Sequence, residues 1–375
     1  MLRSWRAMRA DARALRAPLL RWYRKHKRDL PWRRTTDPYA IWVSEAMLQQ
    51  TTVAAVIPYW QRFLARFPNV AALARAKEED VLAMWTGLGY YRRAKALREG
   101  AIKVLERHMG VVPGDRESLL ALPGVGPYTA GAIASVAFGH PEPVVDGNVK
   151  RVFARLFAIR KNGATVEKKY WSIARALVEG PHPGDLNQAL MELGATVCTP
   201  RSPECARCPV KTSCRARTLG RQESFPVAAA RKPVQDVAVA VAWIERNGRV
   251  LLERKNPGSP LRGTWDLPLV PGLKSRIGLN ATMGAPIATV RHTILTRRLT
   301  IAIVPVRLEG LTPRTTSLRW VRPSEIRTVA TSGATLKAFQ AASSTSSSGS
   351  SGRVKRYDFP SIKGTAPKAQ SSPAQ

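Results

Sequence analysis

The sequence predicts a mainly α N-terminal region followed by a smaller C-terminal domain that is α+β or mostly β. Apolar residues recur with helical periodicity up to residue 214, and the spacing becomes strand-like after residue 236. A polar connector with Gly and Pro, residues 216–235, separates the two patterns. The length of 375 residues suits two or three domains. We therefore place the N-terminal domain at residues 1–215.

Seven segments of the N-terminal domain have helical periodicity, and the breaks between them carry Pro, Gly, Asp or Asn. The expected helices are Ala54–Phe67, Glu78–Met84, Arg92–His108, Tyr128–Phe138, Val149–Ile159, Lys168–Val178 and Asn187–Ala195. Residues 1–20 are rich in Arg and lack the apolar core of a secretory signal. They predict an amphipathic first helix with a basic face, and a transit peptide is the alternative.

The C-terminal domain, expected at residues 236–340, has four strand candidates. They are Val237–Ile244, Arg249–Glu253, Ile287–Thr293 and Leu299–Val306. The first two flank Glu245-Arg246-Asn247-Gly248, a typical hairpin turn. From residue 341 onward Ser, Gly, Pro and Lys dominate, which predicts a disordered basic tail over residues 341–375.

The charge of the chain is strongly positive. Lys and Arg number 60 against 26 for Asp and Glu, a formal net charge of +34. Because this charge is spread along the chain, it indicates a nucleic acid partner in preference to a membrane surface. No apolar run reaches the roughly 18–20 residues that a membrane span needs. The hydrophobic fraction of 44% excludes a fully disordered chain.

All the cysteines lie in one short segment with the spacing C-x6-C-x2-C-x5-C: Cys198, Cys205, Cys208 and Cys214. Thiolates this close together can bind one metal centre, whereas structural disulfides are rare in a reducing compartment. Zinc ribbons prefer two C-x2-C pairs that are a dozen or more residues apart. The single C-x2-C with long flanking gaps favours a [4Fe–4S] cluster over zinc.

The segment Leu122–Ala130, LPGVGPYTA, is a Gly-rich hairpin that leads into a helix. Glycines let the backbone approach a ligand, and the helix N-terminus offers free amides to a phosphate. The segment lacks the GK[ST] ending of a nucleotide P-loop. It matches a helix-hairpin-helix, which grips a DNA backbone without reading sequence, and predicts DNA contacts at Gly124, Val125 and Gly126. An ordinary tight turn between helices is the alternative.

Two carboxylates are candidates for acid–base chemistry. Glu45 lies in an apolar segment, with Ser44 as a potential helix cap, and burial there would keep it partly protonated. Asp146 precedes a helix whose dipole and free amides would keep it ionised. Opposite protonation states suit cleavage of a glycosidic bond. From the residues alone, a capping Asp146 and a solvated or salt-bridged Glu45 stay open.

These residues lie within a series of ordered motifs that spans residues 18–215. The motifs are Leu30–Arg33, Asp37–Tyr39, Val43–Val53, Trp85–Tyr91, Leu122–Ile133, Asp146–Arg151, Asn187–Thr199 and the four-Cys loop. In this series the chain resembles the MutY-type adenine DNA glycosylases of the endonuclease III superfamily. The resemblance implies a six-helix barrel, a second lobe with an iron–sulfur loop, and DNA entering between them.

The resemblance also implies a role for each of four residues. Glu45 would protonate N7 of a flipped-out adenine, and Asp146 would stabilise or covalently trap the sugar cation. Tyr128 and Asn148 would orient this pair. Superfamily members with lyase activity carry a Lys where this chain has Tyr128, and Tyr cannot form the Schiff base. The implied enzyme is therefore a monofunctional hydrolase that acts on adenine opposite 8-oxoguanine or guanine.

Two further residues match side chains that enter the duplex where the adenine leaves. These are Gln50 and Tyr90, for which a polar helix face and a core aromatic are the alternatives. Two other functions remain as alternatives for the whole chain. One is an oxidised-pyrimidine glycosylase/lyase of the endonuclease III type, and the other is a non-catalytic DNA-binding protein. The residue at position 128 disfavours the first, and the presence of both carboxylates disfavours the second.

Residues 237–253 and 263–268 resemble the Nudix-like module that MutY proteins use to sense 8-oxoguanine. A Nudix hydrolase needs several Glu residues for magnesium, but residues 254–308 hold no Glu and a single Asp, Asp266. A recognition role is therefore expected for this domain.

The recognition loop of this module departs from the family pattern. After a His-Thr pair, Ile294-Leu295-Thr296 stands where the family has Phe-Ser-His. Thr296 could replace one hydrogen bond, and Arg297 with Arg298 could contribute to recognition or contact phosphate. Selectivity for 8-oxoguanine is therefore expected to be weaker than usual or to use different residues.

We expect a monomer whose partner is double-stranded DNA with an A:8-oxoguanine or A:G mispair, without membrane contact. Repair or replication proteins could bind the linker or the tail. The expected location is the cytoplasm, on the nucleoid, in a prokaryote, and the nucleus or mitochondrion in a eukaryote. Arg201, Arg207 and Lys211 lie beside the cysteines and are expected to touch phosphate, with the cluster as a structural brace.

Overall fold

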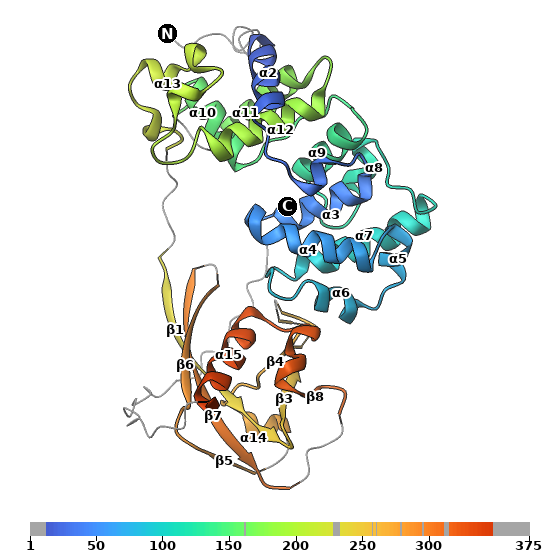
Figure 1. The fold of residues 1–375 in the computed structure, drawn as a ribbon, viewed down its shortest axis with the longest axis vertical. Helices are drawn as coiled ribbons and strands as arrows, with labels where there is room; N and C mark the ends of the chain where they lie inside the picture. Colours follow the sequence, from blue (N-terminus) through green and yellow to red (C-terminus); the bar gives the residue numbers. More distant parts are fainter. Residues whose placement is uncertain are drawn as a thin grey trace.

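The computed structural model describes residues 13–347, except residues 161–162, 228–232, 257, 260, 278–279, 295 and 311–314. The described chain forms two helical lobes and a C-terminal domain with strands and helices (Figure 1). The predicted fold class, a mainly α region followed by an α+β domain, is confirmed. None of the described helices combines the length and apolar character that a membrane crossing requires.

The first lobe contains the helices from the middle of the N-terminal region. They are α3 (Pro38–Leu48), α4 (Val53–Arg66), α5 (Val70–Arg75), α6 (Glu78–Met84), α7 (Arg92–Arg107), α8 (Arg116–Leu120) and α9 (Pro127–Ala137), preceded by the 3-10 turn η1 (Pro31–Arg33). Their apolar faces meet in one core that includes Trp42, Phe63 and Trp85. The Asp37 side chain caps α3 by accepting from two backbone amides. The predicted cap Ser44 is wrong, because this residue lies inside α3 and donates to Ile41 O.

The second lobe combines the start of the chain with the end of the helical region. Its elements are α2 (Arg16–His26), α10 (Gly147–Leu156), α11 (Ala164–Val178), α12 (Pro183–Thr196), η2 (Cys205–Arg207), η3 (Lys211–Ser213), α13 (Arg215–Thr218) and η4 (Gln222–Ser224). Of the expected N-terminal helix, residues 1–12 lie outside the described residues. The linker prediction is wrong in its first half, because Ala216 and Phe225 are buried in the core of this lobe.

The C-terminal domain contains two small sheets with helices against them. Its elements are β1 (Gln235–Trp243), β2 (Glu245–Arg246), β3 (Arg249–Arg254), β4 (Trp265–Asp266), α14 (Leu273–Ile277), β5 (Ala281–Met283), β6 (Ala288–Ile294), β7 (Arg297–Leu308), β8 (Leu318–Val321), η5 (Pro323–Thr328) and α15 (Gly333–Ser347). β1 runs parallel to β7, and β5 and β6 pair antiparallel with β7. In the second sheet β3 pairs with β2, β4 and β8.

The four expected strands are confirmed, and Asn247-Gly248 forms a hairpin turn, but the turn joins β2 to β3, whereas β1 lies in the other sheet, so the expected pairing of the first two strands is wrong. Helix α15 corrects the prediction for the tail, because it continues to Ser347 and buries Ala342. The expected disorder is therefore wrong for residues 341–347, and residues 348–375 lie outside the described residues. Phe339 of α15 packs edge-on against Trp243 of β1, which fixes the helix on the first sheet.

The predicted hairpin between two helices is present at residues 121–126. It joins α8 to α9, and Pro127 occupies the first turn of α9. Gly124 has a φ of 75°, and a Cβ at this position would lie 2.6 Å from the Cβ of Ala96 on α7. The residue must therefore be glycine both for its backbone conformation and for the close approach of the hairpin to α7.

The C-terminal domain contacts the first lobe through Ala330, which is buried in the core of that lobe, and through several polar groups. The Thr86 hydroxyl donates to Val329 O at 3.2 Å and accepts from Thr331 N at 3.3 Å, and the Tyr91 hydroxyl donates to Thr331 O. Glu79 of α6 accepts from Trp265 and pairs with Arg319. The loop before α7 is thus bonded directly to the C-terminal domain.

Candidate active site

A cavity of about 200 Å³ is lined by residues from both helical lobes. Four residues that the sequence predicts as catalytic line it together: Glu45, Tyr128, Asp146 and Asn148. Glu45 comes from α3, Tyr128 from the first turn of α9, and Asp146 and Asn148 from the start of α10. Three separate elements therefore bring the proposed acid and the proposed stabiliser to one space.

Glu45 is a buried carboxyl with one oxygen, Oε2, that has no partner among the described residues. Its side chain lies among the apolar residues of α3. The pKa of Glu45 is raised to about 7, chiefly by burial and also by the nearby charge of Asp146, while a hydrogen bond from Tyr128 and the charge of Arg33 oppose the rise. At neutral pH a large fraction of this group carries a proton, as a general acid requires.

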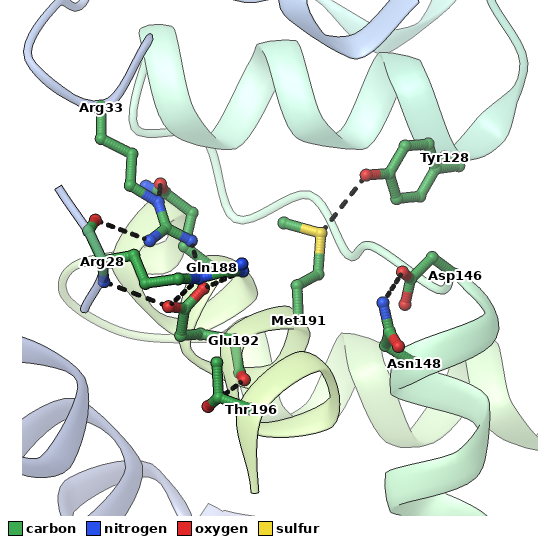
Figure 2. Close-up of polar contacts among 9 residues, drawn as sticks. All are labelled: Arg28, Arg33, Tyr128, Asp146, Asn148, Gln188, Met191, Glu192 and Thr196. Carbon is green, nitrogen blue, oxygen red and sulfur yellow. Dashed lines mark hydrogen bonds and ion pairs between the residues drawn. The ribbon is translucent and has the colours of Figure 1, made fainter. Parts of the chain in front are cut away.

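Asp146 is a half-buried carboxyl with partners. It caps α10, accepting from Val149 N at 2.7 Å. It also accepts from the Asn148 amide at 3.0 Å (Figure 2). Burial raises the pKa of Asp146 above its ordinary value, whereas Val149, Asn148 and Arg151 oppose the rise. The donors at the helix N-terminus lower the pKa as expected, but desolvation is the larger influence, and the ionised state of Asp146 stays a prediction.

Tyr128 and Asn148 are held in place beside these carboxyls. The Tyr128 hydroxyl lies 3.3 Å from Met191 Sδ, and burial together with both carboxylates raises its pKa well above the ordinary value, so it stays neutral. Arg151 donates to Asn148 Oδ1 at 2.8 Å. Because the amide oxygen is engaged in this way, the amide nitrogen of Asn148 is directed to Asp146.

A polar network on another wall of the cavity was not predicted as part of the site. Glu192 accepts from Arg28 Nε at 2.7 Å and from Arg33 Nη2 at 2.8 Å, and Arg33 Nε donates to Gln188 at 3.2 Å (Figure 2). Burial opposes ionisation of Glu192, but the bonds from both arginines outweigh it and lower its pKa to about 2. The signal was present in the sequence, because Gln188 and Glu192 are four residues apart on one face of α12.

The two residues expected to enter DNA lie outside the cavity lining. Gln50 follows α3 and Tyr90 precedes α7, with left-handed φ angles of 58° and 51°. Tyr90 is 44% exposed, which removes the alternative of a core aromatic. Non-glycine residues adopt this conformation only where the surroundings hold them, at a cost of about 1–3 kcal/mol each.

Thr296 and Arg297 lie at the turn between β6 and β7 and do not line the cavity. This end of the hairpin is directed toward the helical lobes (Figure 1). The backbone carbonyl of Thr296 accepts from Gln235 N at 2.7 Å, which ties this turn to the start of β1. Arg297 is exposed, and Arg298 lies 3.5 Å from Asp236.

The four cysteines line a common cavity in the second lobe, together with cations that include Arg155, Lys211 and Arg217. Arg155 Nη1 donates to Cys198 Sγ at 3.3 Å. In the described part of the chain, no group of three or more His, Cys, Asp or Glu side chains meets the geometry of a metal-ion site. The four thiols, lining one space beside cations, could together hold a thiolate-ligated metal centre of negative charge.

Comparison with known proteins agrees with this arrangement. Residues 43–176 match the model of the HhH-GPD superfamily of base excision DNA repair proteins, and residues 239–341 match a NUDIX domain. The solved structure of a thermostable thymine-DNA glycosylase superposes with a TM-score of 0.52 at 30% identity, covering 56% of this chain and 98% of that one. The fold and the site thus define a helix-hairpin-helix base-excision repair protein.

Curated relatives narrow the class. The human adenine DNA glycosylase is 39% identical over an alignment of 406 residues, gaps included. The alignment covers 88% of this chain and 74% of that protein. The Mycolicibacterium smegmatis adenine DNA glycosylase is 43% identical over 221 residues, 59% of this chain and 74% of that protein. The chain belongs to the adenine DNA glycosylase family and is a base-excision-repair enzyme.

Proposed function

We propose that the chain hydrolyses the N-glycosidic bond of adenine mispaired with 8-oxoguanine or guanine, with Glu45 as general acid and Asp146 as the stabilising carboxylate. One observation supports the proposal above the others. A carboxyl with a pKa of about 7 and an oxygen without a partner shares a cavity with a carboxyl that is fixed by hydrogen bonds. Two carboxyls with different environments are the arrangement that glycoside hydrolysis uses.

The reaction follows from these positions. An extruded adenine enters the cavity, and Glu45 transfers its proton to N7 while the electrons of the C1′–N9 bond move into the base. Asp146 stabilises the cation at C1′ or bonds to it. Water then adds to C1′ and loses a proton, which leaves an abasic site and free adenine.

The network of Arg33, Gln188 and Glu192 would hold the base in this reaction. Its amide and guanidinium groups supply donors, and its carboxylate supplies acceptors, on a wall of the cavity where the base edge would lie. Because both arginines fix Glu192, these groups are ordered before adenine arrives. Such preorganisation lowers the cost of positioning the substrate.

DNA would bind through several separate elements. The backbone of Gly124, Val125 and Gly126 would contact a phosphate at the N-terminus of α9. Gln50 and Tyr90 would fill the space that the adenine leaves, which offsets the few kcal/mol that base flipping costs. The β6–β7 turn with Thr296 and Arg297 would face the opposite strand, and the enzyme would act as a monomer.

Cys198, Cys205, Cys208 and Cys214 would hold a [4Fe–4S] cluster. When bound, the cluster would supply a rigid crosslink through four Fe–S bonds, and this chain's own Arg155 ties the loop to α10 by donating to Cys198 O, Thr199 O and Pro200 O. A visible absorption band in the purified protein, lost in Cys208→Ser, would support the cluster. Stoichiometric zinc in a colourless protein would contradict it.

The experiment that tests the proposed function uses the full chain and four duplexes. They contain adenine opposite 8-oxoguanine, adenine opposite guanine, adenine opposite thymine, or thymine glycol opposite adenine, and alkali reveals abasic sites. We expect cleavage of the first two alone. Cleavage of the thymine glycol duplex would instead favour the endonuclease III type of activity.

A second measurement tests the monofunctional mechanism. Borohydride reduces an imine between a Lys and the sugar to a stable covalent complex. Because Tyr128 stands in the hairpin helix and cannot form that imine, we expect almost no trapped complex. Trapping at high yield would contradict the hydrolytic mechanism while leaving the adenine specificity intact.

A further inference from the structure

Arg93, in the first turn of α7, donates side-chain hydrogen bonds to six oxygen atoms. Its Nη1 donates to Ala46 O, Met47 O and Gln49 O, and its Nη2 donates to Thr51 Oγ1, Leu88 O and Gly89 O. No described carboxylate pairs with it, and burial lowers its pKa to about 10, so the group remains a cation at neutral pH. The described partners of Nη1 and Nη2 are thus all uncharged oxygens, while Nε is buried without a partner among the described residues.

Those acceptors belong to two separate segments of the chain. One segment is the end of α3 and the turn after it, where Gln50 lies, and the other is the loop before α7, where Tyr90 lies. The guanidinium carbon also lies 5.4 Å from the ring centroid of Tyr90. The Arg93 side chain therefore hydrogen-bonds to both loops, and each loop contains a residue with a left-handed backbone, Gln50 or Tyr90.

We propose that Arg93 is a positioning residue that locks Gln50 and Tyr90 into one rigid wedge for insertion into the DNA duplex. The proposal rests on the wedge role given to these two residues above. The planar fork of a guanidinium can donate in several fixed directions at once, which a lysine ammonium on a flexible stem cannot do. Without this cation, six oxygen acceptors in two loops would lose a shared donor, and each loop could relax separately.

The test compares Arg93→Met and Arg93→Lys with a matched control on the same helix. Arg98 is also partly buried and donates from Nε to a loop carbonyl, Ala76 O at 2.7 Å, but it contacts neither wedge loop. The first readout is the single-turnover rate of adenine excision opposite 8-oxoguanine. The second is the fluorescence of 2-aminopurine placed at the adenine position, which rises when the base leaves the stack.

We expect Arg93→Met to lose ~100-fold in excision rate, because an error of about 1 Å in positioning has an effect of this order. The fluorescence rise should be lost in parallel, and Arg93→Lys should be intermediate. Arg98→Met should stay close to the parent in both readouts. Circular dichroism establishes that each variant is folded, and Arg93→Lys decides the question if Arg93→Met does not fold.

A double-mutant comparison separates positioning from general support. In a chain that carries Gln50→Ala and Tyr90→Ala, adding Arg93→Met should cause little further loss, because residues that act as a unit are not additive. A full further loss, an equal loss in Arg98→Met, or a folded Arg93→Met with parental rate and fluorescence would overturn the proposal. If the parent chain excises no adenine, the proposed function fails, whereas the fluorescence still reports on the wedge.

Discussion

Glu45 of the helical region and Asp266 of the C-terminal domain are both buried carboxyl groups, and they have opposite surroundings. In the C-terminal domain Asp266 is 4% exposed and accepts from the Thr264 and Thr335 hydroxyls at 2.7 Å and from Ser332 N at 3.0 Å. In the helical region Glu45 is 8% exposed, and its Oε2 has no described partner. Burial alone therefore does not indicate chemistry, whereas burial without compensation does.

The largest expected effect tests the uncompensated group. Glu45→Gln keeps the size of the side chain and removes the transferable proton, so we expect adenine excision to fall by ~10³-fold, within the range for general acids. Binding to the same duplex should persist. The control is Asp266→Asn, whose excision rate should stay near that of the parent. Excision by Glu45→Gln at the parental rate would show that this carboxyl is not the acid.

Asp266, whose carboxyl is fully hydrogen-bonded, is expected to contribute to the stability of the fold. Asp266→Ala leaves two hydroxyls and one amide without their acceptor, so we expect a loss of about 3 kcal/mol in the free energy of unfolding. Urea unfolding of the full chain measures this change. Asp266→Asn retains one oxygen acceptor and should lose less. Equal stability of the parent and Asp266→Ala would contradict the structural role.

The raised pKa of Glu45 makes its effect on stability depend on pH. The folded-state pKa of about 7 lies above the ordinary value of 4.5, so the folded protein favours the protonated form. The contribution of Glu45 is complete below pH 4.5 and is lost as the pH rises through 7. At pH 8 Glu45→Gln should therefore be more stable than the parent by at most ~3 kcal/mol, with no difference near pH 4. Thermal unfolding at both pH values measures the difference.

The sequence predicted the helical region better than the C-terminal domain because periodicity needs length. Glu78–Met84 was predicted with its observed bounds, whereas β4 and β5 have two and three residues and offer no pattern to detect. Helix α15 was hidden by its Ser-rich end, although its buried Ala338 and Phe339 hold it on the sheet. Composition indicated disorder there, and tertiary packing determined the structure.

The candidate site was predictable in its residues and less so in its electrostatics. The motifs located Glu45 and Asp146, and a cap at Asp146 was visible from the helix that follows it. The burial that raises the pKa of Asp146 depends on residues from distant segments of the chain, and the sequence around Asp146 does not show which residues these are. The same holds for the Arg28–Glu192 pair, whose members are separated by 164 positions.

A smaller effect is expected at Tyr128, whose hydroxyl lowers the pKa of Glu45. Tyr128→Phe removes this influence, so the pKa of Glu45 should rise and the alkaline limb of the pH–rate profile should move to higher pH. The rate itself should fall by ~10-fold, because the ring still fills the cavity wall while the polar contact is lost. An unchanged profile would place the hydroxyl outside the proton-transfer step.

The smallest expected effect concerns the surface contact between the two regions. Glu79 of α6 pairs with Arg319 and accepts from Trp265 Nε1 at 3.1 Å, but the Glu79 and Arg319 side chains are 40% and 45% exposed. Water already solvates both charges, so Glu79→Ala should change the free energy of unfolding by less than ~1 kcal/mol and leave excision unchanged. Glu79→Gln is the control, because it keeps an acceptor for the Trp265 indole. A larger loss of unfolding free energy in Glu79→Ala than in Asp266→Ala would contradict this ranking. The exposed ion pair, and not the buried hydrogen-bonded Asp266, would then be the main support of the C-terminal domain.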